Sequence, residues 1–186
     1  EEWIEEAKRR GLSNLRSTVD ALPVFVSKKS VVLFTKNGVY TESEMMARYD
    51  ILLENYYKTL NIEALTMISM VKNDIMGAAC SYQRSLAETI SAKKAALTSI
   101  SCETEEAMLV KASDLTSGLA AGLKKLEEDV DKESVYEDVY DLAKYNRDVI
   151  FEDMGKLREV VDELETRVPK EIWPYPTYGE ILYSVR

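Results

Sequence analysis

The segment that decides the fold is IEALTMISMVKNDIMGAACSYQRSLAETI, residues 62–90. Its apolar side chains recur every three or four residues, which places them on one face of an α-helix. They are Leu65, Ile68, Val71, Ile75, Ala79, Tyr82, Leu86 and Ile90, and Leu97 and Ile100 continue the pattern. No proline interrupts residues 24–168, whereas a strand-rich chain would show turn signals about every 8–12 residues. The pattern predicts a long helix over residues 61–101 in an all-α chain.

Two further apolar stripes predict two more long helices, over residues 104–130 and 135–168. The first consists of Met108, Ala112, Leu115, Leu119, Gly122 or Leu123, Leu126 and Val130. The second consists of Val135, Val139, Leu142, Ile150, Met154, Leu157, Val161, Leu164 and Val168. We expect Thr104 to cap the first helix, residues 131–134 to form a polar turn, and Pro169 to end the second. Short connections favour an elongated antiparallel bundle of about three long helices, crossing at about 20°.

Shorter helices are predicted before the bundle, over residues 1–11, 13–21 and 27–37. Gly11, Pro23 and the Asn37-Gly38 pair are their expected ends. Thr41, followed three residues later by Glu44, forms a capping box that begins the next helix. A break or kink is expected in that helix at residues 60–61.

The C-terminal segment EIWPYPTYGEILYSVR, residues 171–186, differs in composition from the rest of the chain. Pro174 and Pro176 are expected to hold it extended. Trp173, Tyr175 and Tyr178 are the predicted interaction residues, since they combine large apolar faces with polar tips. Two alternatives remain open: the tail folds back on its own bundle, or it packs on another domain or subunit. We expect one structural domain with three parts: flanking helices over residues 1–40, a bundle over residues 41–168 and a tail over residues 169–186.

Composition disfavours several classes of function. A net charge of −9 argues against nucleic-acid binding, and the longest apolar runs fall far short of the ~20 residues of a membrane span. The absence of histidine removes Ser-His-Asp catalysis, Glu-x-x-His di-iron sites and most catalytic zinc sites. No phosphate-binding loop motif occurs. We therefore predict no catalytic, cofactor-binding or metal-binding residue in this chain. Cys80 and Cys102 are expected to be buried, inert thiols, consistent with a reducing cytoplasm.

Three polar or small-residue motifs have alternative interpretations. The acidic groups Glu103, Glu105, Glu106 and Glu127, Glu128, Asp129 could hold a cation, but a solvated surface is the favoured interpretation. Asn146, Arg147 and Asp148 lie near the apolar stripe and could form a polar layer that fixes helix register. Gly118 and Gly122, in a G-x-x-x-G pattern, could allow close backbone approach or mark a weak point.

Both ends of the chain resemble the C-terminal region of type III glutamine synthetases. Residues 6–67 carry the first part of the resemblance, and its most specific segments are DALP at 20–23, GVYTE at 38–42, RY at 48–49 and NIEA at 61–64. Residues 162–165, DELE, and 173–179, WPYPTYG, carry the second part. The middle, residues 86–131, adds little to it.

The resemblance implies a parent enzyme that joins glutamate and ammonia, using ATP and a divalent metal such as Mg or Mn, in a large ring-shaped oligomer. No catalytic motif of that family matches a position here, so no catalytic residue is carried over. The start at Glu1 also leads us to expect a piece of a longer protein. The implied partners are the upstream catalytic domain and neighbouring subunits. The alternative is an independent helical scaffold or docking module unrelated to glutamine synthesis.

Overall fold

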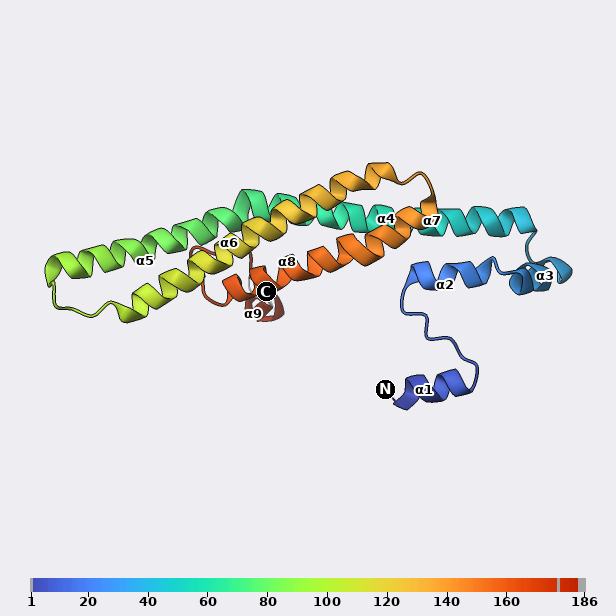
Figure 1. The fold of residues 1–186 in the computed structure, drawn as a ribbon, viewed down its shortest axis with the longest axis horizontal. Helices are drawn as coiled ribbons and strands as arrows, with labels where there is room; N and C mark the ends of the chain where they lie inside the picture. Colours follow the sequence, from blue (N-terminus) through green and yellow to red (C-terminus); the bar gives the residue numbers. More distant parts are fainter. Residues whose placement is uncertain (1, 177, 184–186) are drawn as a thin grey trace. The chain divides into compact units, whose positions relative to one another are not determined.

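The computed structural model describes residues 2–176 and 178–183, and every regular element among them is helical (Figure 1). The predicted all-α class is therefore confirmed. The chain divides into two compact units. Unit 1 comprises residues 1–62 and 131–151, and unit 2 comprises residues 63–130 and 152–186. Each unit thus joins segments that are far apart in the sequence.

Unit 1 contains the short helices and the first part of a long one. Its elements are α1 (Glu2–Arg9), α2 (Thr18–Phe25), α3 (Lys28–Lys36), most of α4 (Glu42–Met70), the 3-10 helix η2 (Lys132–Val135), α7 (Val139–Tyr145) and the π-helix η3 (Asn146–Ile150). The core forms where α2, α4 and α7 meet, around the buried side chains of Val19, Leu53 and Ala143. Aromatic side chains, including Tyr49 and Tyr56 of α4, pack around these three.

Local hydrogen bonds explain where several of these helices begin. The backbone N–H of Glu44 donates to Thr41 Oγ1 (3.2 Å), and the N–H of Thr41 donates to Glu44 Oε2 (2.8 Å). This is the predicted capping box. Ser27 caps α3 by accepting a hydrogen bond from the Ser30 N–H (3.3 Å), so the helix predicted over residues 27–37 is also confirmed.

Two predicted boundaries in unit 1 are wrong. The second short helix begins at Thr18 rather than Ser13, because Ser17 caps it, and it continues through Pro23 to Phe25. The break expected at residues 60–61 is absent, since α4 is continuous from Glu42 to Met70. Asn61 lies inside this helix, and its side chain donates to Glu133 Oε2 (2.6 Å).

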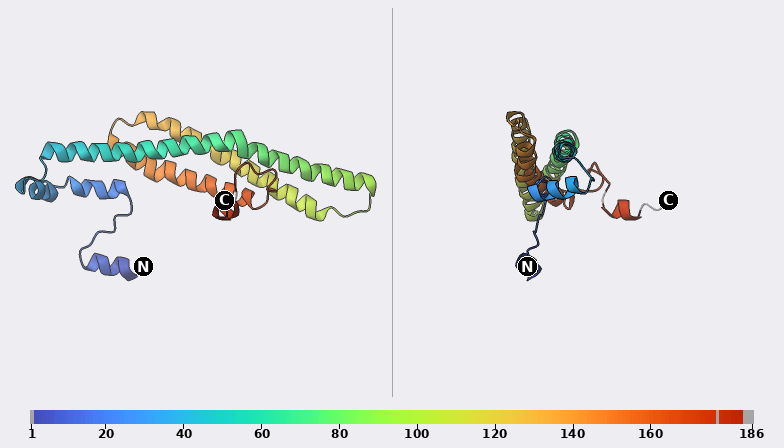
Figure 2. Two further views of the ribbon diagram at one scale, coloured as in Figure 1. Left: turned by 180° about the vertical axis from the view of Figure 1, so that it is seen from behind. Right: turned by 90° about the vertical axis from the view of Figure 1, so that its right-hand side faces the viewer.

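Unit 2 contains the end of α4, the π-helix η1 (Val71–Ile75), α5 (Met76–Ala96), α6 (Glu103–Asp131), α8 (Phe151–Glu165) and α9 (Tyr178–Tyr183). Helices α5 and α6 lie side by side in both ribbon views (Figures 1 and 2). Three contacts join η1 and α5 to α6 in opposite chain order: Lys72 of η1 to Glu127, Gln83 to Thr116, and Lys93 to Glu105. These contacts require the two helices to run antiparallel.

Helix α6 also contacts α8 in opposite chain order. Lys111 pairs with Glu163 (2.9 Å), and Lys125 pairs with Asp153 nearer the other end. Between these pairs, Gly122 faces Leu157, and a Cβ added to the glycine would lie 3.2 Å from Leu157 Cδ1. The G-x-x-x-G pattern therefore permits a close approach at Gly122, whereas Gly118 faces open space.

Most of the predicted stripes are buried, and the exceptions lie mainly near helix ends. The buried stripe residues are Ile68, Val71, Ile75, Ala79, Tyr82, Leu86, Ala112, Leu115, Leu119, Leu123, Leu126, Ile150, Met154, Leu157, Leu164 and Val168. Leu97 and Ile100 are exposed because α5 ends at Ala96 and Leu97 has an extended backbone. Leu65 is also exposed, since the neighbouring Ala64 takes the buried position. Val135 lies in η2 outside the long helices and is 76% exposed.

Three further predictions need correction. Helix α6 begins at Glu103, whose N–H lies 3.4 Å from Ser101 Oγ, so Thr104 is inside the helix rather than its cap. The tail is not extended throughout, because no proline follows Pro176 and α9 forms over residues 178–183. Both cysteines are free thiols, but only Cys102 is buried, whereas Cys80 is exposed.

Candidate interaction site

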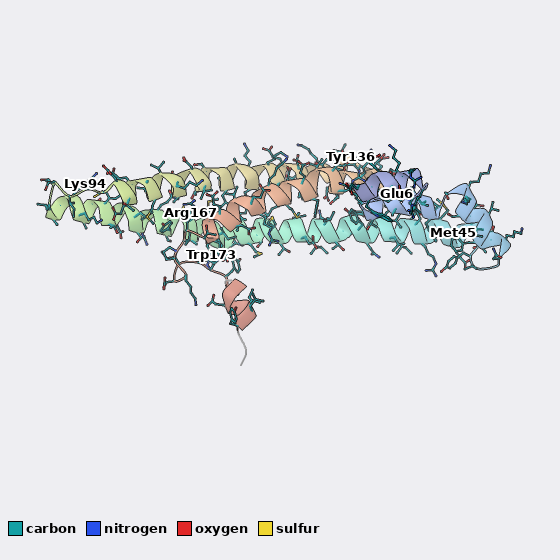
Figure 3. All side chains as sticks on the ribbon, turned by 90° about the horizontal axis from the view of Figure 1, so that it is seen from below. Glu6, Met45, Lys94, Tyr136, Arg167 and Trp173 are labelled. Atoms are coloured by element: carbon teal, nitrogen blue, oxygen red, sulfur yellow. The ribbon has the colours of Figure 1, made fainter. Side chains whose placement is uncertain are left out.

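The tail returns to its own unit through Trp173, which is only 8% exposed (Figure 3). Its indole lies beside a small apolar hollow of about 250 Å³. The walls of this hollow include Met70 and Ile75, near the junction of α4 and α5, and Val161 of α8. Trp173 is thus part of the core of unit 2, as the first of the two alternatives for the tail predicts.

Tyr175 fixes the tail to η1 through a polar contact. Its hydroxyl donates to Asp74 Oδ2 (2.6 Å), and Asp74 lies within this π-helix. Burial, followed by this hydrogen bond, raises the pKa of Tyr175 to about 12. A π-helix adds a residue to the turn and occurs often at functional sites. Here the irregular turn carries the carboxylate that holds the tail.

The third predicted interaction residue, Tyr178, has a side chain that lies outside the described residues. The rest of α9 was not predicted as an interaction site, yet it carries consecutive exposed apolar side chains. Ile181, Leu182 and Tyr183 are 58%, 71% and 84% exposed. They form an apolar run beyond the last proline, at consecutive positions that cannot all face the core.

The acidic groups considered as cation sites are paired with lysines. Glu105 pairs with Lys93, Glu106 with Lys94 and Glu127 with Lys72. Within residues 2–176 and 178–183, no three His, Cys, Asp or Glu side chains come together in a way that could hold a metal ion. These contacts favour the structural interpretation of both acidic groups over a cation site.

Asp129 departs from the expected solvated surface, because it is buried together with Asp153. The ammonium of Lys125 donates to Asp129 Oδ2 (2.8 Å) and also to Asp153. These two hydrogen bonds hold the pKa of Lys125 well above its usual value. The single ammonium bridges two carboxylates buried between α6 and α8 and compensates part of their charge.

The predicted polar layer is present at Asn146, which is fully buried in unit 1. Its side chain donates to the Leu142 carbonyl (3.1 Å) and also bonds Glu133, the carboxylate that Asn61 reaches from α4. Burial is the main cause that raises the pKa of Glu133. The layer therefore consists of Asn61, Glu133 and Asn146 and ties η2 and η3 to α4.

Arg147 and Asp148 are not members of that layer. The Arg147 guanidinium bonds Asp148 (2.7 Å), Ser17 (3.3 Å) and Asp20, and so links η3 to the start of α2. The hydrogen bond from Arg147 lowers the pKa of Asp148. The arrangement is an ion-pair network that joins η3 to α2.

Comparison with known proteins gives these helical units a family. A family model described as the glutamine synthetase C-terminal domain matches residues 1–94, half of the chain. The chain belongs to the glutamine synthetase C-terminal domain family. This membership confirms the resemblance found at the two ends of the sequence.

Individual relatives match this glutamine synthetase domain over its whole length. A glutamine synthetase from Butyrivibrio fibrisolvens is 38% identical over 186 residues, covering 100% of this chain and 27% of the relative. A type-3 glutamine synthetase from Dictyostelium discoideum is 28% identical over 186 residues, covering 98% of this chain and 25% of the relative. A glutamine synthetase from Bacteroides fragilis (strain YCH46) is 26% identical over 188 residues, covering 99% and 26%. The chain thus spans about a quarter of the length of these relatives.

The described helices include none that is long and apolar enough to cross a membrane.

Proposed function

We propose that this chain is the non-catalytic, helical C-terminal domain of a type III glutamine synthetase. The observation that carries the proposal is the 38% identity to a glutamine synthetase over all 186 residues. The parent enzyme would join glutamate and ammonia in the cytoplasm with ATP and Mg or Mn. The family match favours this function over a scaffold unrelated to glutamine synthesis.

The proposed role of the domain is assembly, structural support or regulation of the parent enzyme. Its partners would be the upstream catalytic domain and neighbouring subunits, with no nucleic acid and no membrane. Trp173 and Tyr175 would hold the tail in place, and α9 would offer Ile181, Leu182 and Tyr183 to a neighbour. The exposure of these three side chains supports an interface, because exposed clusters of large apolar groups are typical of interaction surfaces.

We further propose that the chain acts as one structural domain with three parts. Residues 1–40 would flank an elongated antiparallel bundle, residues 41–168, and residues 169–186 would form the tail. The bundle would contain three long helical segments: α4 with α5, α6, and α7 with α8. The opposite chain order of the contacts that α6 makes with η1, α5 and α8 supports the antiparallel order of these helices within unit 2.

The test compares the full-length protein with the 186-residue chain. Both are assayed for glutamine formation from glutamate, ammonia and ATP with Mg or Mn. We expect turnover by the full-length protein and none by the chain alone. Turnover by the chain alone would contradict its non-catalytic role, and a reading frame without a catalytic domain would contradict the parent enzyme.

A further inference from the structure

A groove on unit 1 lies between the end of α2 and the first turns of α4. It has a cavity volume of about 380 Å³, and its walls are formed by Leu22, Phe25, Tyr40, Arg48, Ile51 and Leu52. Ile51 is 57% exposed and Leu52 is 45% exposed. Exposed apolar side chains that line one hollow, unlike scattered ones, are typical of a docking surface.

Helix α3 adjoins this groove and buries none of its residues. Its only aromatic residue, Phe34, contacts the rings of Phe25 and Tyr40, with centroid distances of 5.9 and 5.8 Å. Val32 and Leu33 of α3 are more than half exposed. A nine-residue helix has little stability of its own, since tertiary packing supplies most helical stability. A partner covering this part of unit 1 would therefore stabilise α3.

The charge around the groove identifies the chemistry of that partner. Of the six residues that line the groove, Arg48 alone carries a charge. Its guanidinium lies on the groove wall, 4.8 Å above the Tyr40 ring. A guanidinium in the wall of an apolar hollow favours an apolar segment that carries a carboxylate.

We propose that the groove binds such a segment from the glutamine synthetase portion outside this chain, with its carboxylate beside Arg48. The relatives provide the length for this, because about three quarters of each lies outside the match. The inference rests on the proposed function and adds a surface and a chemistry to it. Docking in the groove would tie unit 1 to the catalytic portion through α2 and α4.

The test uses hydrogen exchange at residues 42–53, measured in the full-length protein and in the 186-residue chain. We expect exchange to be at least roughly tenfold slower in the full-length protein, since the docked segment must leave the groove before these amides exchange. Leu52→Glu places a carboxylate in the groove and should abolish the difference. Leu65→Glu is the matched control, because Leu65 is an exposed leucine (50%) on the same helix, outside the groove.

Unfolding of the 186-residue variants shows whether the substitutions act through folding. Both side chains are partly exposed, so both variants should melt as the wild-type chain does. Equal exchange in the full-length protein and the chain, or equal effects of Leu52→Glu and Leu65→Glu, would overturn the proposal. The proposal would also be overturned if the 186-residue chain forms a dimer and Leu52→Glu dissociates it. In that case a second copy of the chain would occupy the groove. Failure of the proposed function is separate, because the reading frame reveals it before any exchange measurement.

Discussion

At the scale of single residues, Tyr175 makes the tail sensitive to alkaline pH. Its pKa of about 12 lies above the ordinary tyrosine value of about 10, so the fold favours the neutral phenol. Its contribution to stability is present below pH 10 and is lost as the pH rises towards 12. We expect Tyr175→Phe to lower the free energy of unfolding by about 1 kcal/mol at pH 8 and to flatten its decline above pH 10.

Urea unfolding followed by circular dichroism at pH 8, 10 and 11 measures both effects. Tyr183→Phe is the matched control, because it makes the same chemical change at a side chain that is 84% exposed. It should leave the free energy of unfolding unchanged at pH 8. A decline above pH 10 that is as steep in Tyr175→Phe as in the wild type would contradict the assignment.

Glu133 gives a pH dependence of the same sign in a lower pH range, since burial raises the pKa of its carboxyl group. The folded state holds the proton more tightly than the unfolded chain, so stability falls as the pH rises from about 4 through the raised pKa. Glu133→Gln keeps an oxygen to accept the Asn61 hydrogen bond but carries no charge. We expect the free energy of unfolding of this variant to exceed that of the wild type by up to about 1 kcal/mol at pH 8 and to equal it at pH 4.

Thermal and urea unfolding across pH 4–8 tests the role of Glu133. The exposed neighbour Glu137 provides the control, since Glu137→Gln removes an equal charge from a side chain outside the buried layer. A Glu133→Gln protein that is less stable than the wild type at pH 8 would show that the ionised carboxylate is the form the layer requires.

At the scale of elements, the two glycines of α6 give a matched comparison. Gly118 faces open space, so Gly118→Ala should gain helix propensity and raise the free energy of unfolding by about 0.5–1 kcal/mol. At Gly122 a Cβ would lie 3.2 Å from Leu157 Cδ1, so the Leu157 side chain must move. We expect Gly122→Ala to gain nothing or to destabilise unit 2. Urea unfolding of both variants measures this, and equal gains would contradict the close approach of α6 to α8.

The elements also show what the sequence could predict. Apolar spacing identified the buried faces of α5, α6 and α8, and the capping box of Thr41 and Glu44 identified the start of α4. Apolar spacing could not locate the π-helices η1 and η3, because buried residues continue through both at helical spacing. The hydrogen bond from Asn61 to Glu133 could not be predicted either, because the two residues lie 72 positions apart.

The candidate site was also predictable only in part. The aromatic and proline content of residues 173–178 identified the tail as a packing segment, and Trp173 is indeed buried. The hydrogen-bond partner of Tyr175 could not be predicted, because Asp74 lies 101 residues earlier in an irregular turn. The helical form of α9 was missed because the prolines before it suggested an extended chain.

At the scale of the whole molecule, the tail links stability to the proposed assembly. Truncation after Val168 removes Trp173, a side chain that is only 8% exposed. Loss of a buried tryptophan costs about 3–5 kcal/mol in a typical core, and the hydrogen bond of Tyr175 to Asp74 is lost with it. We expect the truncated parent enzyme to melt at a lower temperature and to sediment as smaller species than the wild type.

A second variant separates the two consequences of that truncation. Leu182→Glu with Tyr183→Glu keeps Trp173 and Tyr175 in place but puts charge on the exposed face of α9. If α9 contacts a neighbouring subunit, the parent enzyme with this double substitution should sediment as smaller species, because a buried carboxylate opposes association. The same substitutions in the 186-residue chain should leave its melting temperature unchanged. Unchanged sedimentation of both the double variant and the truncation would rule out the tail as an assembly element. Smaller species from the truncation alone would assign assembly to residues 169–180.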